Sequence, residues 1–384
     1  MKRSSRESFR VAVAAGGTGG HIMPALALAE ALQNIGHPVE TDFICGNRPV
    51  EREIYAQAGV SPRIFPVGAI TAKGAIPRTW QAVGLGYSFV RSLLMMRRYD
   101  VVVGMGGYIT GPVLSAALMC RVPIVLHDSN TVLGRVNRIM APKAKVIACG
   151  MPLIDAPKEV DPARIVETGT PVRLSISKGD RVEAAAAMYL QPGAFTLFIC
   201  GGSQGAGKPN ALAAEAIGRL AHLWPRSRPL QVIWATGPRN VETVRAALQN
   251  QPIRGQLFIA PTIERMDHAY AMADLVISRA GGSTLAEIMM CGLPSILFPL
   301  PHAVGRHQHH NARVLERHSA AVILDEIKIS GDDLARQIMG LALNPERLAA
   351  MGASARRLAC PDAARDLARI VVETAIAAPP AARA

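Results

Sequence analysis

Short apolar runs alternate with longer amphipathic segments along most of the chain. In the first half, the apolar runs predict buried strands at residues 11–15, 39–44, 64–67, 101–103, 124–127 and 146–148. The segments between them predict helices, the clearest at residues 22–35, 77–98, 111–120 and 132–140. Strands that alternate with helices in this way form a parallel sheet through right-handed crossovers.

A second series of the same kind begins at Phe195. Its predicted strands cover residues 195–200, 231–235, 257–260, 275–278 and 295–299, and helical patterns follow at 331–343 and 361–377. A chain of 384 residues is long enough for two domains. The pattern therefore predicts an α/β protein with two doubly wound, Rossmann-like domains and a boundary near residues 171–174.

Glycine-rich turns follow the first strand of each series. Residues 16–21 read Gly-Gly-Thr-Gly-Gly-His, and residues 201–205 read Gly-Gly-Ser-Gln-Gly. Such turns let backbone N–H groups approach a phosphate or sugar at the positive end of a helix dipole. Two of them predict a nucleotide-linked ligand in a cleft between the domains. Neither turn fits the dinucleotide or P-loop pattern, which argues against a nicotinamide dehydrogenase or a P-loop enzyme.

The densest group of candidate ligand residues is 278–287, which reads Ser-Arg-Ala-Gly-Gly-Ser-Thr-Leu-Ala-Glu. A strand end, an arginine, two glycines and a helix start make an anion site, in which Arg279 could meet a diphosphate. Glu287 falls one helical turn after Ser283, where its carboxylate can accept the hydroxyls of a ribose. The alternative is that Glu287 only complements the helix dipole.

His21 closes the first glycine turn, directly before a predicted helix. A histidine in that place can accept a proton at neutral pH. It can equally be a loop or helix-capping histidine, and its position alone does not decide between the two.

The sequence gives no sign of a metal site. It contains no Asp-x-Asp motif, and the histidines between residues 302 and 310 are irregularly spaced without an acidic or cysteine neighbour. We therefore expect neither a metal nor another cofactor, and a leaving diphosphate would be stabilised by helix N-termini and arginine.

The spacing of the cysteines and the length of the apolar runs limit where the protein can be located. The six cysteines are scattered and form no CxxC pair, which is typical of a reduced protein. No run of eighteen apolar residues occurs, and the apolar run near the N-terminus is too short for a signal peptide. These features predict a protein that stays in the cytosol.

Positive charge is concentrated in one region. The formal net charge is +13, and residues 73–145 contain ten Lys or Arg against two Asp. An anionic membrane or nucleic acid would explain this excess. Nucleic acid fits less well, because aromatic residues are not interleaved with the basic ones.

The predicted helix at 77–98 carries two apolar stripes, of which one can face the sheet. The first stripe is Trp80, Val83, Tyr87, Val90 and Leu94, and the second is Leu85, Phe89, Leu93 and Met96. An apolar patch beside arginines suits an anionic membrane surface, whereas burial of both stripes in the domain or a dimer is the alternative. We assign the membrane patch to Trp80, Leu85, Phe89, Arg91, Leu93, Met96 and Arg97.

At these motifs the sequence resembles the bacterial MurG family of N-acetylglucosaminyltransferases. The likeness runs from about residue 11 to the C-terminal helix. It rests on residues 15–21 with Pro24, 104–108, 127–130, 171–173, 201–206, 278–287, His307, Gln308, Asn311 and Ala312. The family usually has Glu where Asp128 stands and Asn where Thr170 stands, so no direct role is carried over to Asp128.

The resemblance implies a GT-B fold and an inverting transfer of GlcNAc from UDP-GlcNAc to carbon 4 of MurNAc in lipid I, giving lipid II. It implies an N-terminal acceptor- and membrane-facing domain at residues 1–172, onto which the helix at 361–377 packs, and a UDP-GlcNAc-binding domain at 173–360. His21 is the family's candidate for the base. The implied donor contacts are Thr18, Gly19, Gly20, Asn130, Arg173, Ser203, Ile263, Gly282, Ser283, Thr284, Leu285, Ala286, Glu287 and Gln308.

The resemblance also implies partners and a location. The partners are UDP-GlcNAc, lipid I, an anionic membrane surface and other cell-wall synthesis proteins, and not nucleic acid. The location is the cytoplasmic face of the inner membrane, as a peripheral protein. Two alternatives stay open: an isomerase like UDP-GlcNAc 2-epimerase, and a catalytically silent membrane scaffold.

Overall fold

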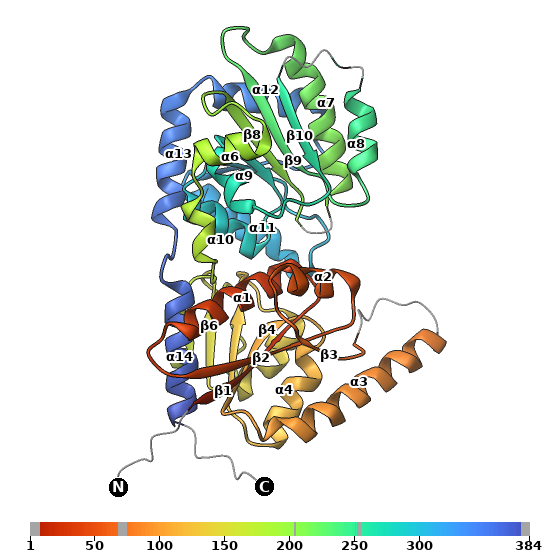
Figure 1. Ribbon diagram of the computed structural model, residues 1–384, viewed down its shortest axis with the longest axis vertical. Coiled ribbons are helices and arrows are strands. Elements are labelled where there is room, and N and C mark those ends of the chain that lie inside the picture. The colour runs from red at the N-terminus through yellow and green to blue at the C-terminus, as the bar shows by residue number, and fades with distance from the viewer. Residues whose placement is uncertain (1–7, 68–74, 203–204, 250, 252–254, 378–384) are drawn as a thin grey trace. The chain divides into compact units, whose positions relative to one another are not determined.

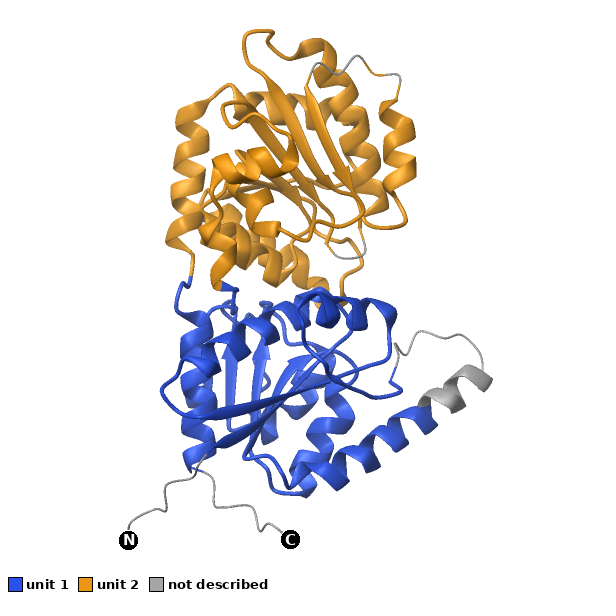
Figure 2. Ribbon diagram, in the orientation of Figure 1, with its two compact units in different colours: residues 1–173, 360–384 blue, residues 174–359 orange. Residues whose placement is uncertain are grey.

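The computed structural model describes residues 8–67, 75–202, 205–249, 251 and 255–377, with side chains in the helix from Ala75 described from residue 82 onward. The chain divides into two compact units (Figure 2). Unit 1 comprises Met1–Arg173 with Cys360–Ala384, and unit 2 comprises Leu174–Ala359. Each unit is a parallel sheet with helices on both faces (Figure 1).

The sheet of unit 1 has seven strands in the order β3-β2-β1-β4-β5-β6-β7, all parallel. The chain starts in the middle of this sheet, builds one half, and then crosses to the other side of β1 to build the rest. The bounds are β1 (Phe9–Ala15), β2 (Val39–Cys45), β3 (Arg63–Ile64), β4 (Val101–Gly106), β5 (Ile124–Asp128), β6 (Val146–Cys149) and β7 (Ile165–Glu167).

The sheet of unit 2 repeats this topology with six parallel strands in the order β10-β9-β8-β11-β12-β13. Its bounds are β8 (Phe195–Cys200), β9 (Leu230–Ala235), β10 (Gln256–Ala260), β11 (Leu275–Ser278), β12 (Ser295–Leu297) and β13 (Ala321–Ile323). In each sheet the strand order reverses at one point, between β1 and β4 or between β8 and β11. Open α/β sheets bind their ligands beyond the carboxyl ends of the strands at such a point.

Helices cover both faces of each sheet. Unit 1 contains α1 (Gly19–Gln33), α2 (Pro49–Gln57), α3 (Ala75–Met96), α4 (Thr110–Met119), α5 (Arg135–Met140) and α14 (Ala363–Ala377). Unit 2 contains α6 (Arg181–Met188), α7 (Gly207–Leu223), α8 (Val241–Leu248), α9 (Met266–Met272), α10 (Gly282–Cys291), α11 (His307–Arg317), α12 (Gly331–Ala342) and α13 (Pro345–Arg357).

The central strand β1 contributes to two apolar cores because its side chains alternate between the faces. Val11 and Val13 lie in the core that α1 and α14 cover, together with Leu367 of α14. Ala12 and Ala14 lie in the core on the other face, where α4 packs. The C-terminal helix therefore completes unit 1, although it follows all of unit 2 in the sequence.

The structure confirms the predicted parallel α/β alternation and differs from it at the sheet edges. The predicted strand at 64–67 is the short β3, Arg63–Ile64. Two edge strands, β7 and β13, were not predicted. Each has three residues. β7 contains the exposed Val166 and Glu167, whereas β13 lies within the apolar run 320–324, which could have indicated it.

Helix α3 corrects the assignment of the two apolar stripes. Leu85, Phe89 and Leu93 pack against the core that contains α4 residues, and Met96 is fully buried. Met96 therefore cannot face a membrane, and the other three residues are half-buried against this core, so these four do not form the exposed stripe. The exposed stripe is the other one, Val83, Tyr87, Val90 and Leu94 at 62, 56, 53 and 80% exposure.

The charged members of the predicted patch are placed differently. Arg91 and Arg97 are exposed. The Arg91 guanidinium lies over the Phe65 ring at 4.7 Å and donates to the Ile64 carbonyl. The side chain of Trp80 lies outside the described residues. Helix α3 thus presents an apolar stripe and arginine on its exposed side.

Candidate functional site

Two glycine turns meet at the point in unit 1 where the strand order reverses. Gly16 and Gly17 follow β1, and Gly106 and Gly107 lie at the end of β4. The Gly16 N–H donates to the Gly106 carbonyl at 3.3 Å. A Cβ on Gly107 would lie 2.4 Å from the Gly16 carbonyl oxygen, so this close approach requires glycine.

The His21 ring lies against both turns. Its Nδ1 is 2.8 Å from the Gly16 carbonyl oxygen, and a Cβ on Gly106 would come within 2.8 Å of Nε2. A carbonyl only accepts hydrogen bonds, so Nδ1 carries the hydrogen and Nε2 of the neutral ring keeps its lone pair. The side chain bonds a loop carbonyl and not a helix amide, so His21 does not cap α1. The ring is therefore held in the tautomer that accepts a proton at Nε2.

The end of β5 is organised by Asp128, which is buried. One carboxylate oxygen accepts from the backbone and side-chain N–H groups of Asn130 at 3.2 and 3.1 Å. The other accepts from the Gly134 N–H at 2.8 Å and from Asn137 Nδ2 at 3.0 Å. Asp128 therefore shapes the turn that holds Asn130, which is a structural task for this carboxylate.

His127, directly before it, is buried and uncharged at neutral pH. Burial lowers the pKa of His127 to about 4, against the opposing effect of the Asp128 carboxylate. A ring in this state is a core side chain at the end of β5. Of the two histidines at these strand ends, His21 is the one with the geometry of a base.

The corresponding point in unit 2 lies between β8 and β11. Gly201 and Gly202 follow β8, and Gly202 has a left-handed φ of +79°. Ser203 lies outside the described residues. After β11, helix α10 begins behind Gly281, a capping residue that has no side chain to offer the first-turn amides. The positive end of α10 is therefore built from backbone N–H groups alone at its cap.

Glu287 lies in α10 and is held by a tyrosine. The Tyr270 hydroxyl donates to Glu287 Oε2 at 2.8 Å, and its ring packs edge-on against Phe198. Burial and the Glu287 carboxylate raise the pKa of Tyr270 well above its ordinary value, so the hydroxyl keeps its proton. Sequence reasoning did not single out Tyr270, because only folding brings α9 beside α10.

Arg279 does not supply a spare positive charge. Its guanidinium lies 2.6 Å from Glu326 Oε2 and donates to the Phe298 carbonyl at 3.1 Å, with both charged side chains largely buried. The ion pair braces the end of β11 against the segment after β13, and the bond to Phe298 ties it to the end of β12. Arg279 is therefore not proposed as a diphosphate contact.

Helix α11 places two neutral side chains close to the same region. Gln308 accepts the Leu300 N–H at 3.0 Å, and the fully buried Asn311 donates to the Ala280 carbonyl at 3.0 Å. Asn311 thereby ties α11 to the loop that precedes α10. Over the described part of the chain, no three His, Cys, Asp or Glu side chains are grouped closely enough to hold a metal ion.

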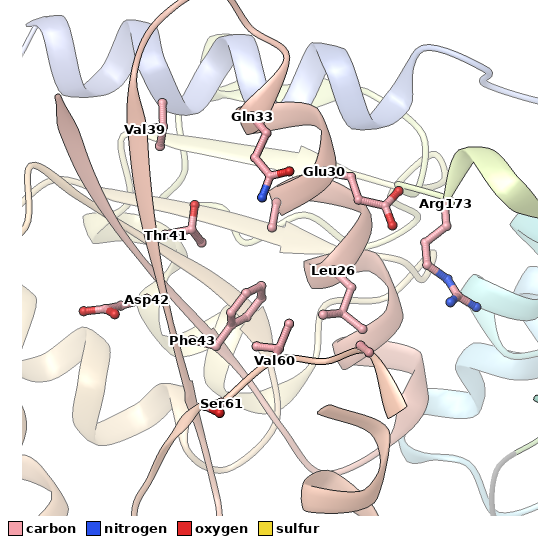
Figure 3. A pocket seen from close by; sticks show the side chains of 12 residues that line it. Leu26, Glu30, Gln33, Val39, Thr41, Asp42, Phe43, Val60, Ser61 and Arg173 are labelled. Carbon is pink, nitrogen blue, oxygen red and sulfur yellow. The ribbon is translucent and has the colours of Figure 1, made fainter. Parts of the chain in front are cut away.

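The remaining predicted residues are spread over both units. Ile263 follows β10 in unit 2 and is half-buried. Arg173 ends unit 1 and lines a cavity of about 500 Å³ with Glu30 and Gln33 of α1 and Thr41 of β2 (Figure 3). This cavity lies along the second half of α1, away from the carboxyl ends of the strands, so it is not the candidate site.

Comparison with known proteins gives one consistent result. Residues 11–149 match the glycosyltransferase family 28 N-terminal domain, and residues 196–367 match the glycosyltransferase family 28 C-terminal domain. A UDP-N-acetylglucosamine--N-acetylmuramyl-(pentapeptide) pyrophosphoryl-undecaprenol N-acetylglucosamine transferase of Halothermothrix orenii is 35% identical over 94% of this chain and 97% of its own.

Solved structures agree with the sequence comparison. Acinetobacter baumannii MurG is 26% identical with a TM-score of 0.70, over 95% of this chain and 99% of its own. A UDP-GlcNAc 2-epimerase from Neisseria meningitidis has a TM-score of 0.67 at 11% identity, over 95% of this chain and 100% of its own, which shows a shared fold alone. The predicted GT-B fold is confirmed.

We expect Asp128→Asn to loosen the turn at 130–137, because a carboxamide cannot accept all four hydrogen bonds. Loss of charged acceptors costs about 1–3 kcal/mol, so the Asn130 and Gly134 amides should exchange roughly 10- to 100-fold faster. Hydrogen-exchange mass spectrometry measures this, with Asp155→Asn, at an exposed aspartate, as control. Unchanged protection in Asp128→Asn would contradict the structural role.

Proposed function

Because this chain belongs to the MurG family of glycosyltransferases, we propose that it transfers GlcNAc from UDP-GlcNAc to carbon 4 of MurNAc in lipid I, giving lipid II for peptidoglycan synthesis. The 35% identity to the Halothermothrix orenii N-acetylglucosamine transferase, over 94% of this chain, supports this pair of substrates. One feature of the structure carries the chemistry: the His21 ring, held by the Gly16 carbonyl with Nε2 as its basic nitrogen.

His21 acts as the base in the proposed reaction. Its Nε2 takes the proton from the acceptor hydroxyl while that oxygen attacks the anomeric carbon from the face opposite UDP. The bond from the anomeric carbon to the diphosphate oxygen breaks, and the electron pair leaves with UDP. The N–H groups and dipole at the start of α10 stabilise the charge that develops there.

The donor residues follow from the family resemblance and from the placement of α10. Glu287, aimed by Tyr270, accepts the ribose hydroxyls, and the Ile263 backbone binds the uracil. Residues 282–286 meet the diphosphate. The further donor contacts are Thr18, Gly19, Gly20, Asn130, Arg173, Ser203 and Gln308.

The assay is UDP release from UDP-GlcNAc with and without a short-chain lipid I analogue. We expect release that depends on the analogue, and a loss of about 10²- to 10⁴-fold in kcat for His21→Ala, typical of a removed base. Donor binding should persist. The control is His318→Ala, because His318 makes a similar contact, Nδ1 to the Val314 carbonyl, but is the C-cap residue of α11 in unit 2.

Other outcomes of the same assay would contradict the proposal. Formation of UDP-ManNAc from UDP-GlcNAc alone would indicate a 2-epimerase. Donor binding without turnover of the analogue would indicate a silent scaffold. Near-normal turnover by His21→Ala would exclude His21 as the base.

Tyr270→Phe tests the donor site. Removing the hydroxyl leaves Glu287 without the hydrogen bond that aims it, and a bond to a charged group contributes about 1.5–3 kcal/mol. We expect the KM for UDP-GlcNAc to rise roughly tenfold or more with kcat little changed. Steady-state kinetics check this against Tyr189→Phe, at a tyrosine that is 87% exposed in the same unit. Equal KM values in both variants would remove Tyr270 from the donor site.

The exposed stripe of α3 is the proposed membrane contact. Among the described residues, no helix is both apolar enough and long enough to cross a bilayer. Val83, Tyr87, Val90 and Leu94 would instead lie in the interface with arginines beside them, as in a peripheral protein. We place this contact at the cytoplasmic face of the inner membrane, where the resemblance implies that the acceptor is met.

Leu94→Asp should weaken binding to vesicles, because it puts a negative charge into the apolar stripe. We expect the bound fraction on vesicles with anionic phospholipid to fall severalfold in a flotation assay. Leu343→Asp, at a half-exposed leucine of unit 2, is the matched control. Equal loss in the two variants would place the membrane contact elsewhere.

A further inference from the structure

Two charged side chains at the start of α2 hold both polar groups of one glycine. The Gly17 N–H donates to Glu51 Oε1 at 2.5 Å, and the Gly17 carbonyl accepts from Arg48 Nη1 at 2.6 Å. Arg48 is the N-cap residue of α2, and Glu51 lies in its first turn. Neither residue takes part in the reaction as proposed above.

The Glu51 carboxylate is enclosed by backbone. It is 2% exposed, and a Cβ on Gly46 would lie 2.7 Å from Oε2, while one on Gly16 would lie 3.2 Å from Oε1. Burial raises the pKa of Glu51, against the opposing effects of the Gly17 N–H and Arg48. A buried acid with glycines on two sides is a built feature of this turn, because its burial is costly without such partners.

The carboxylate acts on His21 through one peptide group. The Gly17 N–H and the Gly16 carbonyl belong to the same peptide bond, which is planar. Glu51 holds the N–H end of that plane, and His21 Nδ1 bonds its carbonyl end at 2.8 Å. The orientation of this peptide therefore decides whether His21 Nδ1 meets an acceptor or a donor.

A peptide between two glycines rotates at little steric cost, and Gly17 already has a φ of +88°. After a flip, the N–H would point at His21 Nδ1 and Nε2 would carry the hydrogen, a tautomer that cannot accept a proton there. The flipped carbonyl would also face the Glu51 carboxylate, and two acceptors repel. The negative charge of Glu51 thus disfavours the unproductive orientation.

We propose that Glu51, assisted by Arg48, is a positioning residue that sets the tautomer of His21 through the Gly16–Gly17 peptide. Its effect on rate rests on the proposed function, in which His21 Nε2 accepts a proton. Its effect on the tautomer does not depend on that function. Arg48 restrains the next carbonyl along the chain and balances the buried charge.

The first test is kinetic. Glu51→Gln keeps the shape but can donate to a flipped carbonyl, so we expect kcat to fall at least tenfold with the UDP-GlcNAc dissociation constant unchanged within twofold. Glu53→Gln is the matched control, at an exposed acid in the same helix. Arg48→Ala should lower kcat in the same direction, with the exposed Arg52→Ala as its control.

These paired variants separate positioning from a charge effect through space. If the variants acted only through their charge, the acidic limb of the pH profile of kcat would shift in opposite directions. The reason is that Glu51→Gln removes a negative charge and Arg48→Ala removes a positive one. In the His21→Ala background, Glu51→Gln should cause no further loss, since the residue acts through His21. Additive losses in that background would overturn the proposal.

The second test does not depend on activity. Nitrogen-15 NMR of histidine-labelled protein at about pH 8 reports the tautomer of His21, whose signals are identified by their absence in His21→Ala. We expect hydrogen on Nδ1 in the wild type, and a mixture or the reverse in Glu51→Gln. An unchanged tautomer in Glu51→Gln overturns the proposal, even in a chain that transfers no GlcNAc. If circular dichroism shows that Glu51→Gln does not fold, the tautomer in Arg48→Ala decides in the same way.

Discussion

Backbone-to-backbone contact at the ends of β1 and β4 is the constraint on which unit 1 depends. These strands are neighbours at the point where the strand order reverses, and the Gly16–Gly17 and Gly106–Gly107 turns meet there. A side chain on Gly107 would push the turns apart, because its Cβ would overlap the Gly16 carbonyl. The same carbonyl holds His21, so the geometry of the basic nitrogen follows from a contact that only glycine permits.

Unit 2 repeats the topology, but different groups surround the place where its strand order reverses, between β8 and β11. In unit 1 the Gly17 amide of the glycine turn is already taken by an internal anion, Glu51. In unit 2, helix α10 begins behind a glycine, and the nearby Arg279 is neutralised by Glu326. The α10 amides are the ones that we propose for a negatively charged ligand. Two units with the same topology therefore need not bind the same ligands, because different side chains contact the turns in each unit.

Residues that directly follow strands could be predicted from the sequence, whereas their partners could not. Parallel topology fixes that His21 and residues 282–287 follow the carboxyl ends of strands, so their candidacy was evident. Glu51 gave no signal, because an acid in the first turn of a helix ordinarily complements the dipole. Tyr270 and Glu326 reach Glu287 and Arg279 from elements that only the tertiary fold brings together. The edge strand β7 was missed because two of its three residues are exposed, whereas the apolar run at 320–324 around β13 was a signal that the sequence did offer.

The assignment of α3 failed because periodicity gives the angle between two stripes but not which of them is inside. Small residues were the missed signal. Gly84, Ser88 and Ser92 recur every four residues, and the two serines are fully buried. A Cβ on Gly84 would lie 2.4 Å from the Pro66 carbonyl oxygen, so the backbone approaches closely on this side. A helix packs its small residues inward where neighbours come close, and this leaves the stripe of Tyr87 and Leu94 for whatever lies outside the protein.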